Sequence, residues 1–104
     1  MPTTTIDGHD IHVNDEGFMT EYDEWTEDLG KVLAGQIGIE MSDDHWKAIH
    51  FLRRDFPDQG ETATLRRVST VGGIPTKQLF ALFPKKPAKK MAYIAGLPKP
   101  RGCV

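Results

Sequence analysis

The sequence has 104 residues, enough for one domain with a modest core, and 38% of them are hydrophobic. No apolar run approaches the roughly 18 residues of a transmembrane helix. Its first ten residues lack the basic start and apolar block of a signal peptide. The single cysteine, Cys103, cannot form an internal disulfide. A cytoplasmic, reducing location is therefore expected.

Charge is divided sharply along the chain. Residues 1–61 carry all 15 acidic residues and four basic ones, a net charge of −11, whereas residues 62–104 carry nine basic residues and no acidic one. Two interpretations are open. The two halves attract and neutralise each other in the fold. Alternatively, the basic half creates a positive potential that favours the thiolate of Cys103 and attracts acidic partners.

The first predicted elements are short strands. Residues 3–13 are typical of a β-hairpin, because β-prone residues flank the turn signal Asp7-Gly8. A second turn is predicted at 14–17, after which Phe18-Met19 is predicted to add a short third strand.

Five helices are predicted to follow, each with apolar residues at helical spacing. Their expected limits are Thr20 to Gly38, Ser42 to Pro57, Ala63 to Val71, Pro75 to Pro84 and Pro87 to Gly96. Thr20 and Asp23 resemble a capping box, and glycine or proline ends most of these helices. The predicted fold is a single α+β domain over residues 1–96. A β-hairpin or meander over 1–19 packs on a helical array over 20–96, whose centre is like a helix-turn-helix.

The last eight residues, 97–104, form a predicted flexible C-terminal arm that carries Cys103. Pro98 and Pro100 fix φ and lack a backbone N–H, whereas Gly102 permits rotation directly before the cysteine. Seven residues in polyproline II geometry reach roughly 20 Å. A lone terminal cysteine is often incidental, but a thiol on a stiff arm beside Lys99 and Arg101, which favour the thiolate, indicates a function.

Other site chemistries have less support in the sequence. The four histidines have no metal-ligand spacing and only one cysteine is present, so no metal is expected. Residues 42–83 resemble a helix-turn-helix, and Arg66, Arg67 and Lys77 could face phosphates. The candidate recognition helix over 76–83 is largely apolar, however, and most of it is expected in the core. Direct binding of nucleic acid is therefore not expected, and a DNA-binding regulator with a redox-sensing cysteine is kept as the alternative function.

Several segments resemble a known protein family. They are Leu82-Phe83-Pro84, Pro87-Ala88-Lys89, Ile94 to Pro100 and Gly102-Cys103-Val104, with His45-Trp46, Phe51-Leu52-Arg53 and Leu65-Arg66 upstream. Together they resemble the sulfur-carrier family that includes the gamma protein of dissimilatory sulfite reductase, DsrC, and the tRNA-thiolation relay protein TusE. The resemblance covers nearly the whole chain and implies a β-hairpin, a helix array and a mobile C-terminal arm.

The resemblance implies that Cys103 accepts sulfane sulfur as a persulfide and relays it to a partner protein. Such a chain is at most a sulfurtransferase that acts as a protein sulfur carrier, and it needs no cofactor. The implied partners are a Tus- or DsrEFH-like donor and, as acceptor, a tRNA-thiolating enzyme or a sulfite-reductase-type complex, with no membrane involved. Arg66, Lys99 and Arg101 are candidates for stabilising the anionic sulfur or docking the arm. For Arg66, a structural place on a helix surface is an equal alternative.

One departure from the family pattern concerns a second cysteine. Members that serve dissimilatory sulfite reductase carry it eleven residues before the last cysteine, where this chain has Ala92. A disulfide or trisulfide within the chain is therefore impossible. This favours a single-cysteine role like that of TusE and leaves a third branch of the family open. A non-catalytic subunit whose tail inserts into an enzyme complex is the remaining alternative.

Overall fold

A computed structural model of the chain describes residues 3–6 and 8–100. Four C-terminal residues named above, Arg101, Gly102, Cys103 and Val104, lie outside the described residues, as does Asp7 of the predicted turn. The elements in chain order are β1 (Thr3–Ile6), β2 (His9–His12), the 3₁₀ turn η1 (Tyr22–Glu24), α1 (Glu27–Gln36), α2 (Asp43–Gln59), α3 (Leu65–Thr70), α4 (Thr76–Leu82) and α5 (Pro87–Ala95). The predicted α+β fold, a small hairpin with about five helices, is confirmed.

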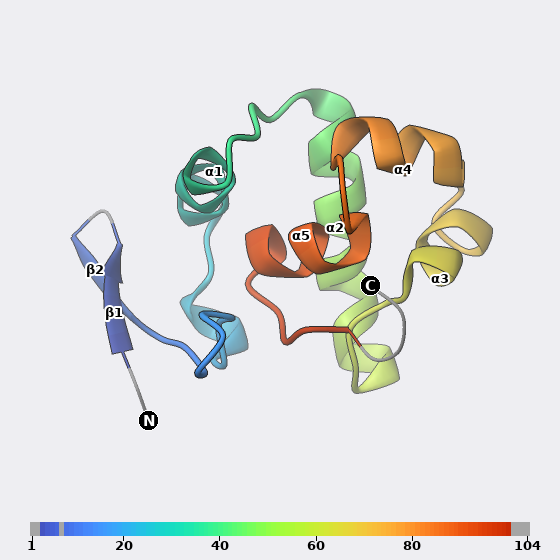
Figure 1. Cartoon of the computed structure of the whole chain (residues 1–104). Coiled ribbons are helices and arrows are strands. Elements are labelled where there is room, and N and C mark those ends of the chain that lie inside the picture. Colours follow the sequence, from blue (N-terminus) through green and yellow to red (C-terminus); the bar gives the residue numbers. More distant parts are fainter. Residues whose placement is uncertain (1–2, 7, 101–104) are drawn as a thin grey trace.

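The helices surround α5, which lies in front of α2 in Figure 1 and also contacts α1 and α4. The hairpin lies at one end of the molecule, next to α1, and α3 and α4 lie at the other (Figure 1). The side chains of Leu52, Leu79, Phe83 and Met91 are fully buried where α2, α4 and α5 meet. Burial of apolar surface on α5 from several sides fixes the position of its C-terminal end.

The hairpin is antiparallel, with Thr3 opposite His12 and Ile6 opposite His9. Its buried side chains, Ile6 and Ile11, pack in one cluster with Leu29 and Leu33 of α1. The predicted third strand is reduced to a single bridge between Val13 and Met19.

A carboxylate ties the hairpin to η1. His12 donates its backbone N–H to Glu24 Oε1 at 2.8 Å, and His12 Nδ1 lies 2.7 Å from Glu24 Oε2. These two hydrogen bonds, the backbone one first, hold the pKa of Glu24 below its ordinary value.

We expect this contact to be lost on acidification. A carboxyl whose pKa is lowered by folding stabilises the fold above its unfolded pKa, about 4.3, and this contribution disappears as the pH falls through the folded pKa. A carbon-detected NMR titration should place the midpoint of Glu24 below the unfolded value of about 4.3. The dependence of stability on pH below about 4.3 should be weaker in Glu24→Gln than in the wild type. A midpoint of Glu24 at or above the unfolded value would contradict this.

The predicted start of the first helix at Thr20 is wrong. The chain turns once in η1 and is extended at Trp25 (φ −81°, ψ 142°), and α1 begins only after Thr26. Thr26 is the N-cap, and its hydroxyl accepts from the N–H of Leu29 at 3.1 Å. Because Glu24 is held by the hairpin, the chain cannot enter a regular helix before this point.

The predicted end of the second helix at Pro57 is also wrong. Helix α2 continues through Pro57 to Gln59 and ends at Gly60, which has φ 71°. Proline lacks the N–H that would bond to the carbonyl of Arg53 one turn earlier. The hydroxyl of Tyr22 donates to that carbonyl at 2.7 Å, so the helix loses no buried partner by containing proline.

The helix-turn-helix-like centre consists of α3 and α4, joined through the Gly72-Gly73 turn. The expectation that most of residues 76–83 lie in the core is wrong, because only Leu79 and Phe83 of this segment are buried. Phe80 is 49% exposed, because α4 has only one face against the rest of the molecule. At the C-terminal end of α4, His45 Nε2 lies 2.8 Å from the carbonyl oxygen of Leu82, and this contact links α2 to α4.

Candidate functional site at the base of the C-terminal arm

The candidate site begins where the chain leaves α5. We call Leu97–Pro100 the arm base, since it is the described part of the predicted arm. In Figure 1 it runs from the end of α5 toward the loop between α2 and α3. Leu97 is fully buried. Thr62, itself only 4% exposed, donates its hydroxyl to the carbonyl of Pro98 at 2.7 Å. The arm base is therefore held against the body through its backbone as well as its side chains.

The backbone at the end of α5 forms the hydrogen bonds of a Schellman motif. The N–H of Leu97 donates to the carbonyl of Ala92 at 3.0 Å, and the N–H of Gly96 donates to that of Tyr93 at 3.3 Å. Gly96 has φ 70°, the left-handed conformation that such a motif requires. Two of the four C-terminal carbonyls of the helix are satisfied in this way.

Side chains from distant parts of the chain satisfy the other two carbonyls. Trp25 Nε1 donates to the carbonyl of Ile94 at 2.8 Å, and Arg53 Nη1 donates to that of Ala95 at 3.2 Å. Arg53 Nη2 also donates to the carbonyl of Tyr22 at 3.0 Å. All four carbonyls thus have donors, so the direction in which the chain leaves α5 is specified by the fold.

The guanidinium of Arg53 lies between aromatic rings. Its carbon is 3.7 Å from the ring centroid of Tyr22 and 4.5 Å from that of Trp25, within the range of cation–π contacts. Burial lowers the pKa of Arg53, partly offset by Tyr22 and Asp23. Arginine remains charged at any accessible pH, and its positive charge favours the negative end of the α5 dipole.

Trp25 and Gly96 approach each other closely. A Cβ at Gly96 would lie 2.5 Å from Trp25 Cδ1 and 2.9 Å from Met19 Sδ. On the other side of the indole, a Cβ at Gly30 of α1 would lie 2.9 Å from Trp25 Cζ2. Glycine at both positions lets the indole fit between α1 and the end of α5.

The predicted supporting residues Lys99 and Arg66 lie on different elements of the fold. Lys99 is on the arm base, where its Nζ lies 3.3 Å from Glu16 Oε2. Arg66 is exposed on α3, and it makes no hydrogen bond or ion pair with any residue in the described ranges. No hydrogen bond or ion pair joins the side chains of Lys99 and Arg66, and Arg101 and Cys103 lie outside the described residues.

Sequence reasoning missed the structural role of Arg67, which it named only as a residue that could face phosphates. Arg67 donates from Nε and Nη2 to the two carboxylate oxygens of Asp55 at 2.8 and 2.7 Å. Asp55 is only 8% exposed, and its hydrogen bond raises the pKa of Arg67. This pair joins α3 to α2 behind the loop that holds the arm base. No periodicity in the sequence indicates which of the two arginines faces Asp55.

Ala92, the position at which the resemblance implies a second cysteine in some members, is fully buried in α5. A shallow pocket of about 200 Å³ adjoins the arm base and is lined by Phe56, Gly60, Glu61, Thr62, Pro98 and Lys99.

Within the described ranges, no group of three or more His, Cys, Asp or Glu side chains could hold a metal ion. None of the described helices is long and apolar enough to cross a membrane.

These features define a small α+β protein in which a fixed segment follows the last helix, and its single cysteine comes three residues later in the sequence. The family model described as DsrC like protein matches residues 5–104. Sulfurtransferase TusE of Escherichia coli (strain K12) is 32% identical over 106 residues, which cover 95% of this chain and 97% of that protein. The gamma subunit of the dissimilatory-type sulfite reductase of Nitratidesulfovibrio vulgaris is 34% identical over 105 residues, which cover 100% of both chains.

A solved structure agrees with these relatives. The NMR structure of DsrC from Allochromatium vinosum superposes with a TM-score of 0.79 at 33% identity and covers 98% of this chain and 97% of that one. The chain therefore belongs to the DsrC-like family, and the resemblance noted in its sequence is confirmed. The DNA-binding alternative gains no support from these relatives.

Proposed function

We propose that the chain is a sulfur carrier in which Cys103 accepts a sulfane sulfur as a persulfide and passes it to a partner protein. One observation carries the proposal: the single cysteine follows, by three residues, a segment whose backbone the fold holds in place. Family membership supports it, because named relatives are a sulfurtransferase and a sulfite reductase subunit.

The proposed reaction is an exchange of sulfur between thiols. The thiolate of Cys103 attacks the outer sulfur of a donor persulfide, a new S–S bond forms, and the donor leaves as a thiolate when its own S–S bond breaks. Transfer to the acceptor repeats this step with the roles exchanged. No net oxidation or reduction occurs, so the step needs no resident cofactor. With Ala92 in place of a second cysteine, the sulfur has to leave to another molecule.

The partners follow from this chemistry. We propose a sulfurtransferase as donor, and a tRNA-thiolating enzyme or a sulfite-reductase-type complex as acceptor, in the reducing environment of the cytoplasm. Residues 97–104 act as the arm. Lys99 and Arg101 favour the anionic sulfur, and the exposed Arg66 contributes to docking of the arm.

Intact-mass spectrometry after incubation with glutathione persulfide tests the proposal. The wild-type chain is expected to gain the mass of one sulfur atom, which dithiothreitol removes, and Cys103→Ser is expected to gain none. Equal gain by both chains, or no gain by either, would refute the carrier function. In the same assay, Lys99→Gln and Arg101→Gln should load more slowly than Arg66→Gln, because a neighbouring charge affects the thiolate directly.

A non-catalytic subunit is distinguished by a second measurement. In extracts of the source organism, Cys103→Ser should still enter the same complexes as the wild type but should lose sulfur transfer. Retention of both complex formation and function in Cys103→Ser would favour a purely structural subunit.

A further inference from the structure

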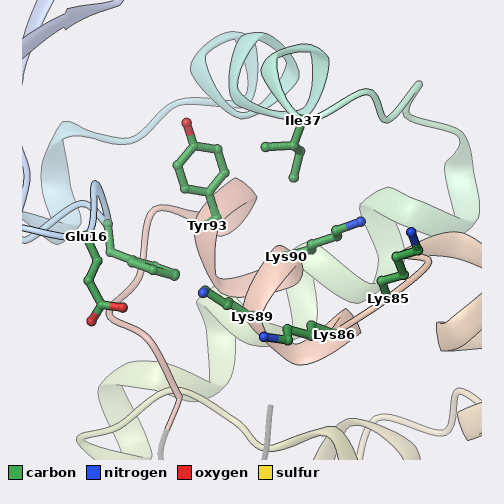
Figure 2. A pocket seen from close by; sticks show the side chains of 8 residues that line it. Glu16, Ile37, Lys85, Lys86, Lys89, Lys90 and Tyr93 are labelled. Atoms are coloured by element: carbon green, nitrogen blue, oxygen red, sulfur yellow. The ribbon is translucent and has the colours of Figure 1, made fainter.

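A second hollow lies between the end of α1 and α5, and it plays no part in the reaction above. It measures about 430 Å³. Its apolar lining comes from Phe18, Ile37 and Tyr93, and its polar lining is dominated by lysines, namely Lys85, Lys86, Lys89 and Lys90. In Figure 2, Tyr93 and Ile37 lie on one side of the hollow, and Lys89 and Lys90 lie on the other. We call it the lysine-rimmed pocket.

The apolar part of this pocket is held in place. The ring of Phe18 meets that of Tyr93 edge-on, with centroids 6.1 Å apart and planes at 89°. The hydroxyl of Tyr93 donates to Gln36 Oε1 at 3.0 Å. Burial raises the pKa of Tyr93, so its phenol stays neutral at physiological pH. A partner side chain entering here would meet a fixed apolar surface and not a mobile one.

The charges around the pocket are mostly uncompensated. Among the described residues, the side-chain ammonium groups of Lys85, Lys86 and Lys89 have no hydrogen-bond or ion-pair partner. Lys90 donates to the carbonyl of Pro84. The one carboxylate in the lining, Glu16, already lies 3.3 Å from Lys99 of the arm base. The rim therefore presents positive charge that no described acidic group neutralises.

The ion pair between Glu16 and Lys99 joins the lysine-rimmed pocket to the arm base. Glu16 lines the pocket, and Lys99 lines the shallow pocket beside Pro98. The lysine-rimmed pocket therefore lies beside the arm base, where one partner surface can contact both. Protein interfaces commonly combine an apolar anchor with a charged rim whose complementarity speeds association.

We propose that the lysine-rimmed pocket is the docking site for an acidic segment of the partner protein that exchanges sulfur with the arm. One aromatic or aliphatic side chain of that segment fills the apolar part, and carboxylates on either side pair with Lys86 and Lys89. The identity of the partner as a sulfur-exchanging protein rests on the proposed function, whereas the chemistry of the segment rests on the pocket.

Nitrogen-15 NMR of the full chain tests the site with the probe peptide acetyl-Glu-Asp-Phe-Leu-Asp-Glu-amide. Shift changes are expected to cluster on Ile37, Tyr93 and the lysines of the rim. A Lys86→Glu/Lys89→Glu double variant is expected to bind about tenfold more weakly, since two exposed ion pairs are lost and replaced by repulsion. Lys47→Glu/Lys77→Glu, which changes the net charge equally on exposed lysines elsewhere, is expected to bind as the wild type does.

Three results would overturn the proposal. They are shift changes that spread over α3 and α4, equal weakening by both double variants, and equal binding of a peptide with serines in place of Phe-Leu, which would indicate only a cationic surface. A separate assay, the loading of Cys103 by glutathione persulfide, distinguishes a failure of the docking proposal from a failure of the proposed carrier function. Lys86→Glu/Lys89→Glu should load normally, so failure of docking leaves loading intact and failure of loading leaves docking intact.

Discussion

Gly96→Ala is expected to lower the free energy of unfolding by about 3–4 kcal/mol, measured by urea denaturation. A left-handed conformation costs an alanine about 1–2 kcal/mol. Its Cβ would also lie 2.5 Å from Trp25 Cδ1, and overpacking of this kind costs about 1–3 kcal/mol more. The indole has no room to retreat, because Gly30 lies against its other edge.

Gly60→Ala is the matched control. Gly60 ends α2 with φ 71°, nearly the value at Gly96, but a Cβ there would meet no atom within 4 Å. It should therefore show only the conformational cost, about 1–2 kcal/mol. Equal losses in the two variants would mean that the contact with Trp25 contributes nothing, and the close approach of Trp25 to the end of α5 would lose its energetic significance.

Arg67→Met is expected to destabilise the fold by about 3 kcal/mol. The substitution keeps much of the side-chain volume but leaves the carboxylate of Asp55, 8% exposed, without its two charged donors. Removal of one partner from a buried ion pair costs about 3–5 kcal/mol, and the partial exposure of Arg67 places this case at the lower end.

Arg66→Met, one residue earlier, provides the comparison. Arg66 is exposed and has no partner among the described residues, so its loss should change stability by no more than about 0.5 kcal/mol. A large effect of Arg66→Met on stability would show that it is a structural residue. An effect on sulfur loading or transfer with unchanged stability would support its proposed place in docking.

Local signals in the sequence predicted most of the elements. Pro87 begins α5 and Gly96 ends it, as their backbone preferences dictate. The errors in the helix limits occur where a contact between residues distant in the sequence decides where a helix begins or ends. Helix α1 starts late because His12 holds Glu24, and α2 passes through Pro57 because Tyr22 supplies the missing donor. Neither contact has a local signature.

The candidate site was only partly accessible from the sequence. Cys103 is conspicuous as a lone cysteine after a proline-rich segment, and Lys99 precedes it by four residues. The groups that fix the arm base, Trp25, Arg53 and Thr62, act across separations of 69, 42 and 36 residues. Arg53 lay within a segment of family resemblance, which was the one available signal for it.

In the part of the chain that the structure describes, the fold pairs only some charges of the acidic half with charges of the basic half. Asp55 with Arg67, and Glu16 with Lys99, are pairs between the acidic and the basic half of the chain. The lysines at the start of α5 are left without acidic partners among the described residues. Mutual neutralisation therefore applies to these two pairs, whereas a positive potential that favours the thiolate of Cys103 stays a prediction.

The anchoring of the arm base limits how far the sulfur can travel. Cys103 follows Pro100 by three residues. At no more than about 3.6 Å per residue, its Cα stays within about 11 Å of Pro100 while these contacts hold. A partner cysteine near a protein surface lies within that radius, but one at the bottom of a deep channel does not.

A deeper partner cysteine would require the arm base to detach. Withdrawing Leu97 from the core and breaking the bond between Thr62 and Pro98 would cost about 3 kcal/mol together. A partner that demands this would bind about a hundredfold more weakly than one with equal contacts and a shallow cysteine. In the proposed carrier function, the anchored arm base would thus favour sulfur acceptors whose thiols lie near the protein surface.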